Sequence, residues 1–262
     1  MDPVPFMSPP DESFRSLPPK PWEGFLLVGL CVTLFTVGAA LVQGEDMAAR
    51  FLILPAVAFL APSVAWVLWR GGSREAFPLR RPMSRQVFVA AALAMGGSLL
   101  ALSLAGFLSG LTGAQRDEPA LRALLLSAGP LWRFLFFALA PAVCEEALFR
   151  GAFLWALRPW GATVASLVSG LAFAAVHASW LKFLPVALLG WALAQVVLRT
   201  GNIGLAVAGH ALHNSAILGI VSLGTGVEET SYGILLLAAL AGLVAIGLAV
   251  AWRWSREGTG SG

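Results

Sequence analysis

The chain has 262 residues, of which 58% are hydrophobic and only 12% are charged. Average soluble domains carry about a quarter of charged residues, so this composition excludes an ordinary soluble surface and favours a protein of the lipid bilayer. The formal net charge of +3 is too small and too dispersed to indicate nucleic-acid binding. Cys31 and Cys144 both lie in apolar stretches, which excludes a disulfide framework or a cysteine-based metal site.

The first 21 residues are rich in proline and poor in apolar residues, a composition that cannot pack a core. We expect residues 1–21 to form a flexible tail. The apolar run that follows lacks a convincing small-residue cleavage site, so it is interpreted as an uncleaved membrane span rather than a signal peptide.

A helix needs about 20 apolar residues to cross a hydrocarbon core of about 30 Å. This requirement predicts an all-α polytopic membrane protein with about eight spans: residues 22–43, 48–69, 87–112, 130–157, 162–179, 182–199, 203–222 and 233–253. Many of the tryptophans fall near the ends of these segments, as expected of interfacial anchors. We divide the chain into the tail, the N-terminal helices and loops at 22–129, a core at 130–222, and the last helix with a short tail at 223–262.

Lysine and arginine residues are distributed unequally between the two predicted sides of the membrane. If the 70–86 loop with its five arginines is cytoplasmic, eleven Lys and Arg residues share that side and five lie opposite. The excess of positive charge on cytoplasmic loops therefore predicts that both termini are cytoplasmic. Compact loops without a targeting signal favour a prokaryotic cell membrane.

Six ionisable side chains lie within the apolar spans, and all three histidines of the chain are among them: Glu145, Glu146, Arg150, His177, His210 and His213. Burying such groups in a membrane is costly, so each is a candidate functional residue. The alternative is a structural polar cluster that holds the helices together.

Helical geometry indicates how the acidic side chains are used. Glu146 and Arg150 are four residues apart with the acid first, which favours an intrahelical ion pair. Glu145 projects about 100° away from Glu146 and is left to face a cavity.

Two further spacings bring histidines toward the same site. The break at Pro159–Trp160–Gly161 predicts a helical hairpin in which Glu145 and His177 lie at similar depth. On the seventh span, His210 and Asn214 are four residues apart and share a face. The expected catalytic cavity therefore lies among the fourth, fifth and seventh spans.

These residue types are typical of a hydrolase. Glu145 can take a proton from water, His177 can orient that water, and His210 with Asn214 can donate to an oxyanion. The alternative is a zinc ion held by Glu145, His177 and His210, since two histidines and one carboxylate form a known zinc site. A helical HExxH sequence, which would decide for zinc, is absent from the chain. Because the set lacks thiolates and one carboxylate with imidazoles suffices to activate water, no cofactor is expected, with zinc as the alternative.

The strings EEALFR at 145–150, FAAVH at 173–177 and HALHN at 210–214 resemble three ordered motifs, EExxxR, FxxxH and HxxxN. These are the motifs of the CPBP family (CAAX protease and bacteriocin-processing, also called Abi), which includes the Rce1-type prenyl-protein endopeptidases. The resemblance covers residues 130–220. It implies that Glu145 is the catalytic carboxylate, that His177 acts with it on water, and that His210 and Asn214 lie on the oxyanion side.

The same resemblance gives supporting roles to Glu146 and Arg150. Phe173, four residues before His177, is interpreted as packing that shapes the cavity wall. His213 lies one turn from His210, and both a cavity position and a helix-packing role stay open for it.

The sequence thus predicts an intramembrane endopeptidase that acts on a peptide bond near the membrane surface of a membrane-attached protein or peptide. One alternative is a non-catalytic immunity or scaffold protein of the same fold, and another is a transporter with a proton-relay carboxylate. Family members cut prenylated CaaX tails, leader peptides or C-terminal sorting anchors, and no residue here selects among them. The expected partners are this substrate and the lipid bilayer, without nucleic acid; no residue pattern indicates an oligomeric state.

The depths of the candidate residues predict a buried, water-filled cavity that opens to the non-cytoplasmic side. The resemblance implies the opposite side, because Rce1-type enzymes act on cytoplasmic tails.

Overall fold

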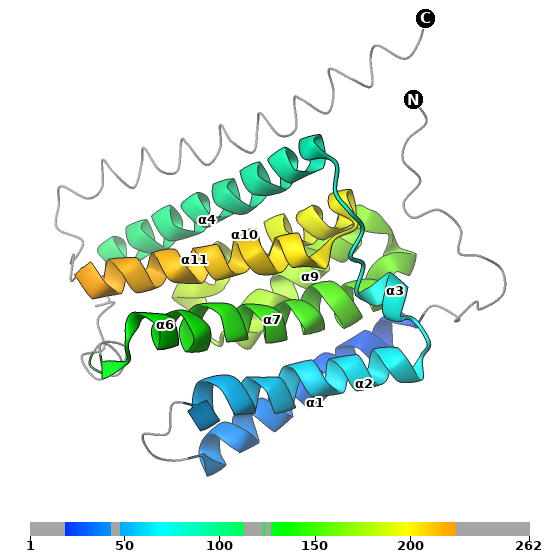
Figure 1. The fold of residues 1–262 in the computed structure, drawn as a ribbon, viewed down its shortest axis with the longest axis horizontal. Coiled ribbons are helices and arrows are strands. Elements are labelled where there is room, and N and C mark those ends of the chain that lie inside the picture. The colour runs from blue at the N-terminus through cyan, green and yellow to red at the C-terminus, as the bar shows by residue number, and fades with distance from the viewer. Residues whose placement is uncertain (1–18, 43–47, 113–122, 124–126, 224–262) are drawn as a thin grey trace, which may run out of the picture.

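The computed structural model describes residues 19–42, 48–112, 123 and 127–223 (Figure 1). Within these residues the regular secondary structure is helical, and a single isolated bridge joins Leu79 and Asn202. The prediction of an all-α protein is therefore confirmed. Residues 1–18 of the tail predicted at 1–21, and the predicted eighth span at 233–253, lie outside the described residues, and Pro21 is the first residue of a helix rather than part of a tail.

The N-terminal part contains three long helical stretches. The first is α1 (Pro21–Leu41), and the third is α4 (Ser84–Thr112). The second runs from residue 49 to residue 69 as η2 (Ala49–Ile53), η3 (Ala56–Leu60) and α2 (Ala61–Trp69), with Pro55 between its two π-helical segments. Proline lacks the backbone N–H that an α-helix needs, which explains a local change of helical register at this point. The short helix α3 (Ser73–Ala76) lies between α2 and α4.

The C-terminal part begins with a helical stretch at 130–157 that turns back on itself at residues 158–160. Its segments are α6 (Pro130–Arg133), η4 (Phe134–Leu139), α7 (Ala140–Glu146), η5 (Ala147–Phe153), α8 (Leu154–Leu157) and the 3₁₀ turn η6 (Arg158–Trp160). Gly161, with φ of 79°, then starts α9 (Gly161–Val176). The helices α10 (Trp180–Thr200) and α11 (Ile203–Leu223) follow.

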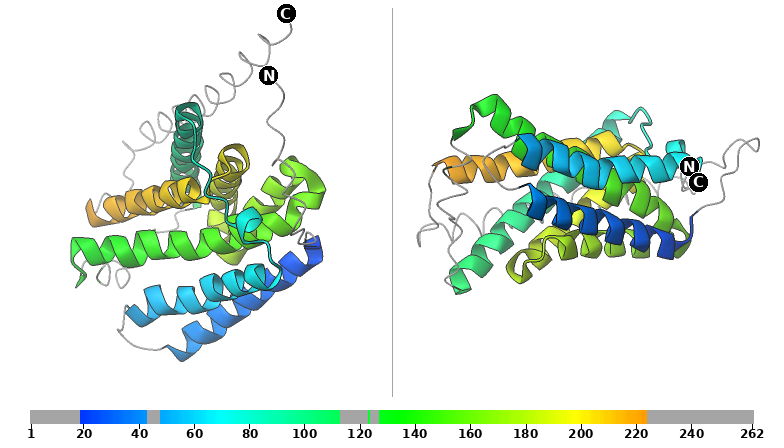
Figure 2. Two further views of the ribbon diagram at one scale, coloured as in Figure 1. Left: turned by 45° about the vertical axis from the view of Figure 1, so that its right-hand side comes forward. Right: turned by 90° about the horizontal axis from the view of Figure 1, so that it is seen from below.

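The long helices lie side by side in one bundle (Figures 1 and 2). On one side of the bundle α1 packs against η3 and α2, and on the other side α4 packs against α10 and α11. The stretch that contains α7 lies between these two sides and contacts both η3 and α11. It is therefore the central element of the fold, and it carries both adjacent glutamates.

Five described stretches are long and apolar enough to cross a membrane: Pro21–Leu41, Ala49–Trp69, Gln86–Leu108, Pro130–Val176 and Trp180–Thr200. The fourth has 47 residues, enough for two passes, and it contains the turn at 158–160. Large apolar side chains of α1, including Leu26, Leu30 and Leu41, are exposed along its length, as expected of a helix that faces lipid. The protein is a polytopic membrane protein, and the count of eight spans stays a prediction.

The segment between α2 and α4 is fixed to one end of the bundle. The backbone N–H of Arg80 donates to the carbonyl of Gly201, and the N–H of Ile203 donates to Pro78. The Arg158 guanidinium donates to the carbonyl of Glu75. The connector at 70–83 therefore lies beside both the turn before α9 and the turn before α11.

Close contact between α9 and α10 depends on two glycines. A Cβ atom at Gly170 would lie 2.7 Å from the backbone nitrogen of Trp191, and one at Gly190 would lie 2.9 Å from Cα of Gly170. Any larger residue would separate the helices, as in other membrane helix pairs that meet through small residues. This contact brings the backbone of α10 within reach of side chains on η5.

The fifth predicted span, at 162–179, is too long. The helix α9 ends at Val176, and His177 is its C-cap residue rather than an interior residue. The backbone N–H groups of His177 and Ala178 donate to the carbonyls three residues earlier, and Ala178 then adopts a positive φ of 48°. A tightened last turn followed by a left-handed residue ends an α-helix, which explains the difference.

Candidate active site

The two adjacent glutamates lie at the junction of α7 and η5, and their environments differ. The Glu146 side chain is fully buried, whereas the Glu145 side chain is 21% exposed. Neighbouring residues of a helix project about 100° apart, so one carboxylate enters the protein interior while the other lies at its edge. The π-helical register that begins directly after Glu146 is a feature often found at functional sites.

Arg150 and Glu146 form the predicted ion pair. Nη1 of Arg150 donates to Oε1 of Glu146 at 2.8 Å, and neither side chain is exposed. Nη2 of Arg150 donates to the carbonyl of Gly190 on α10 at 3.0 Å, and the guanidinium carbon lies 4.4 Å from the centre of the Phe173 ring. The buried cation thus has a carboxylate, a carbonyl and an aromatic face as neighbours, which offset the loss of its hydration.

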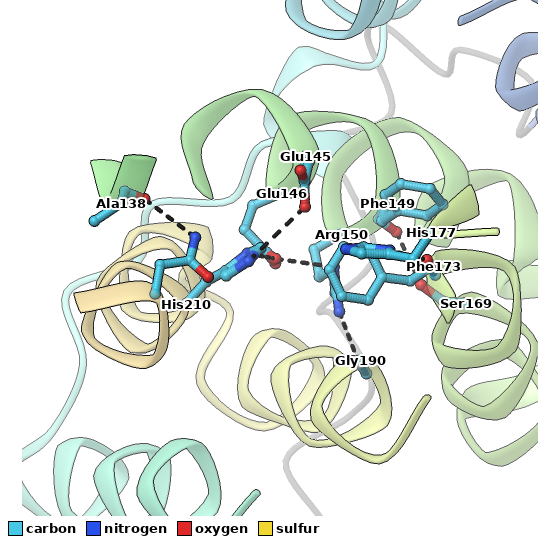
Figure 3. Close-up of polar contacts among 11 residues, drawn as sticks. Ala138, Glu145, Glu146, Phe149, Arg150, Ser169, Phe173, His177, Gly190 and His210 are labelled. Atoms are coloured by element: carbon cyan, nitrogen blue, oxygen red, sulfur yellow. Dashed lines mark hydrogen bonds and ion pairs between the residues drawn. The ribbon is translucent and has the colours of Figure 1, made fainter. Parts of the chain in front are cut away.

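His210 on α11 joins the two glutamates (Figure 3). Its Nδ1 lies 2.9 Å from Oε1 of Glu146, and its Nε2 lies 3.8 Å from Oε2 of Glu145. A carboxylate at Nδ1 fixes the orientation of an imidazole and leaves Nε2 to face the reacting groups. Glu146 therefore holds His210 as well as Arg150, a second contact that the sequence interpretation did not include.

His177 lies at the exposed end of α9, and its ring is held by Phe173. Its Nδ1 is 2.8 Å from the carbonyl oxygen of Phe173, and the two ring centres are 4.9 Å apart. A backbone carbonyl only accepts, so Nδ1 carries the proton and Nε2 is left as an acceptor. Within the described part of the chain, no hydrogen bond or ion pair joins His177 directly to Glu145.

Phe173 lies between the two imidazoles and is buried. Its ring centre is 5.5 Å from that of His210 and 5.2 Å from that of Phe149. Ser169 on the same helix donates to the carbonyl of Phe149 at 3.0 Å, which fixes α9 against η5 (Figure 3). Phe173 thus contacts both sides of the site.

Asn214 and His213 lie on α11 next to His210. The amide nitrogen of Asn214 donates to the carbonyl of Ala138 on η4 at 3.3 Å. This bond uses one of the two N–H donors of the amide that was predicted to face an oxyanion. His213 is buried, and its Nδ1 has no hydrogen-bond partner among the described residues.

The side chains do not form an evident metal site. In the described ranges, no group of three or more His, Cys, Asp or Glu side chains is arranged to hold a metal ion. The alternative zinc set of Glu145, His177 and His210 is therefore not gathered around one point in this conformation. Cys144, next to Glu145, is buried and packs in the core.

Comparison with known proteins identifies the region that contains the site. Residues 127–216 match the model of a family described as type II CAAX prenyl endopeptidase Rce1-like. The match includes the three motifs from Glu145 to Asn214, and the resemblance inferred from them is confirmed over this region. No curated protein and no solved structure matches the chain.

Proposed function

We propose that the protein is an intramembrane endopeptidase, because residues 127–216 match the model of the type II CAAX prenyl endopeptidase Rce1-like family. Its substrate is a membrane-attached protein or peptide, cut at a bond near the membrane surface. The proposal assigns water activation to Glu145 and His177, and stabilisation of the oxyanion to His210 and Asn214.

The observation that carries this proposal is the unequal use of the two glutamates. Glu146 is occupied by Arg150 and His210, whereas Glu145 is partly exposed and lies 3.8 Å from Nε2 of His210. Among the described residues, no arginine or lysine forms an ion pair with Glu145. A carboxylate of this kind, at the edge of a buried polar cluster, is suited to accept a proton from water. With Nδ1–H of His177 bound to Phe173, Nε2 of the neutral ring can accept a hydrogen bond from that water and orient it.

The proposed reaction follows from these roles. Glu145 takes a proton as the water oxygen bonds to the carbonyl carbon of the substrate. The negative charge that develops on the carbonyl oxygen receives a hydrogen bond from Nε2 of His210, which requires the cationic form of the ring because Nδ1–H is already bound to Glu146. The carbon–nitrogen bond then breaks, and the proton on Glu145 passes to the leaving amine.

Asn214 assists the oxyanion in this proposal with the second hydrogen of its amide nitrogen. The first hydrogen is donated to the Ala138 carbonyl in a long bond of 3.3 Å, so a turn of the amide toward the substrate costs little. Apo sites often hold catalytic hydrogen bonds in long geometries that change when substrate binds.

The test is proteolysis by the purified protein in lipid vesicles. Three probes cover the substrate classes of the family: a prenylated CaaX peptide, a leader peptide and a C-terminal sorting-anchor peptide, each with a quenched fluorophore. We expect cleavage of at least one probe, lost in Glu145→Gln and kept in Glu75→Gln, which changes a carboxylate on α3 at the connector end of the bundle. Folded protein that cuts none of the three would contradict the proposal and favour a non-catalytic immunity or scaffold role.

The orientation in the membrane is part of the proposal. Among the described residues, eight Lys and Arg positions lie at the connector end of the bundle and three at the opposite end: Lys20, Arg70, Arg74, Arg80, Arg81, Arg85, Arg158 and Arg199 against Arg50, Arg133 and Lys182. This asymmetry supports a cytoplasmic connector end. The exposed His177 lies toward the other end, which supports access to the site from the non-cytoplasmic side.

Cysteine accessibility tests the orientation. Ala178 and Gly204 are exposed residues at opposite ends of the bundle, whereas the two native cysteines are buried. Single cysteines at these two positions, in a chain without Cys31 and Cys144, are treated with a membrane-impermeant thiol reagent in intact cells. We expect labelling at residue 178 and not at residue 204, and the reverse pattern would invert the orientation.

A further inference from the structure

Phe173 has more contacts with the polar site than packing alone requires. The side chain is 1% exposed. The Arg150 guanidinium lies over its ring at 4.4 Å, and the rings of His177 and His210 lie at 4.9 Å and 5.5 Å with interplanar angles of 71° and 89°. One aromatic ring thus touches the buried cation and both candidate catalytic imidazoles.

We propose that Phe173 is a positioning residue whose aromatic face holds Arg150 and whose ring thereby sets the relative placement of His177 and His210. The proposal rests on the endopeptidase function given above, and it assigns to this residue an electrostatic task that an aliphatic side chain of equal size cannot perform.

The charge of Arg150 is only partly satisfied by hydrogen bonds. Both terminal nitrogens are bound, to Glu146 and to Gly190, but Nε is buried and has no hydrogen-bond partner in the described part of the chain. The negative face of an aromatic ring attracts a cation, and the attraction is strongest where water is excluded. The ring of Phe173 therefore compensates a cation that hydrogen bonds satisfy only in part.

Arg150 is linked to His210 through Glu146. Arg150 and His210 share the same oxygen of Glu146, at 2.8 Å and 2.9 Å. The position of the guanidinium therefore fixes the carboxylate, and the carboxylate fixes the imidazole. A ring that holds the guanidinium in place acts on His210 through this chain of contacts as well as by direct contact.

His177 contacts Phe173 through both the backbone carbonyl and the aromatic ring of that residue. The backbone carbonyl accepts the Nδ1–H of His177 at 2.8 Å, and the side-chain ring packs against the imidazole. Rotation of the phenylalanine ring away from Arg150 would remove the surface against which His177 rests. The separation of the two imidazoles thus depends on the place of one aromatic side chain.

Fluorinated phenylalanines at position 173 test the proposal, because they weaken the negative face of the ring in steps while they keep its shape and apolar character. Variants with one, three and five ring fluorines are compared with the natural chain for cleavage of the peptide that it cuts best. We expect kcat to fall in steps, by about tenfold or more over the series, with KM within about twofold. A series in which kcat stays level would overturn the proposal.

Phe153 provides the matched control. It is fully buried in the same helical hairpin, and its ring contacts are with Phe25 and Phe149. The same fluorinated residues at position 153 are expected to leave kcat unchanged. An equal fall at both positions would show a general packing effect and would also overturn the proposal.

A readout without substrate separates this proposal from the endopeptidase function itself. The chain has only three histidines, so the ring nitrogens of ¹⁵N-histidine-labelled protein give few signals. We expect the Nδ1 signal of His210 to move in steps as fluorines are added at position 173 and to stay fixed when they are added at 153. If the natural chain cuts no probe, the endopeptidase proposal fails. Independently of that result, an unchanged chemical shift of His210 Nδ1 across the fluorinated series would contradict the role of Phe173.

Discussion

Glu145 and Glu146 are neighbours in the chain, yet they belong to two different halves of the site. Glu146, Arg150 and His210 form a sealed half, in which each side chain is at most 4% exposed and the three are joined by hydrogen bonds below 3 Å. Glu145 and His177 form an open half. Glu145 is partly exposed and lies 3.8 Å from Nε2 of His210, and His177 is exposed.

The difference in burial indicates different roles: the sealed half fixes the positions of the side chains, and the open half is proposed to act on water and substrate. Buried charges need every partner they have, so a change in the sealed half disturbs folding and function together. Groups in the open half reach water and have few bonds to lose, so a change there affects the reaction with little effect on folding. We therefore expect substitutions in the open half to reduce activity alone, and substitutions in the sealed half to reduce activity and stability together.

The largest expected effect is on turnover in Glu145→Gln. The amide keeps the size of the side chain and cannot take a proton from water, so we expect kcat to fall by about 10²- to 10⁴-fold. The free energy of unfolding should change by less than about 0.5 kcal/mol, because the side chain is partly exposed and only weakly paired. Peptide cleavage and chemical unfolding in mixed micelles measure the two quantities. A variant that keeps full activity would remove Glu145 from the mechanism.

The next effect is on stability in Arg150→Ala. Removal of the guanidinium leaves the Glu146 carboxylate buried without its strongest partner, which costs about 3 kcal/mol or more of unfolding free energy. Activity should fall as well, since His210 shares that carboxylate. Unfolding in mixed micelles measures the loss.

The double variant Glu146→Leu, Arg150→Met is the control for this prediction. It removes both charges and fills the space with apolar side chains, so it should be more stable than Arg150→Ala while it stays inactive. If the single variant unfolds like the natural chain, the pair is not part of a sealed half.

A smaller effect is expected at His213. It is buried next to His210, but its Nδ1 lacks a partner among the described residues, and such a group lowers stability. His213→Phe should therefore raise the unfolding free energy by about 1 kcal/mol and leave kcat within about threefold. A much larger fall in cleavage would assign His213 to the open half as a group that serves substrate or water.

The parts of the site that the sequence predicts are those set within one helix. The pair of Glu146 and Arg150 follows from a spacing of four residues, because the helical repeat fixes which side chains are neighbours. The contact of His210 with Glu146 depends on how α11 is rotated and shifted against α7, and no periodicity within either helix contains that information. The same holds for the carbonyl that Gly190 offers to Arg150.

The end of α9 shows a second limit. The sequence from His177 to Trp180 contains no glycine or proline, and the residue that ends the helix with a positive φ is Ala178. Alanine rarely takes this conformation, so nothing in the local sequence marks the end, and the predicted span continued to residue 179. The turn leaves His177 exposed at the end of α9.

The smallest effect is expected from removal of metal. Zinc would draw Glu145, His177 and His210 to one point, which would merge the open half with part of the sealed half. In the structure Nδ1 of His177 is bound to Phe173 and Nδ1 of His210 to Glu146, so only the two Nε2 atoms are left for an ion, and no described group of three ligands is gathered. We therefore expect cleavage to survive treatment with a strong chelator followed by gel filtration, with metal content measured on the same active sample. The contradicting result is one zinc ion per protein whose removal abolishes activity. The nucleophile would then be a zinc-bound hydroxide instead of water activated by Glu145, and the division into two halves would hold only for the metal-free protein.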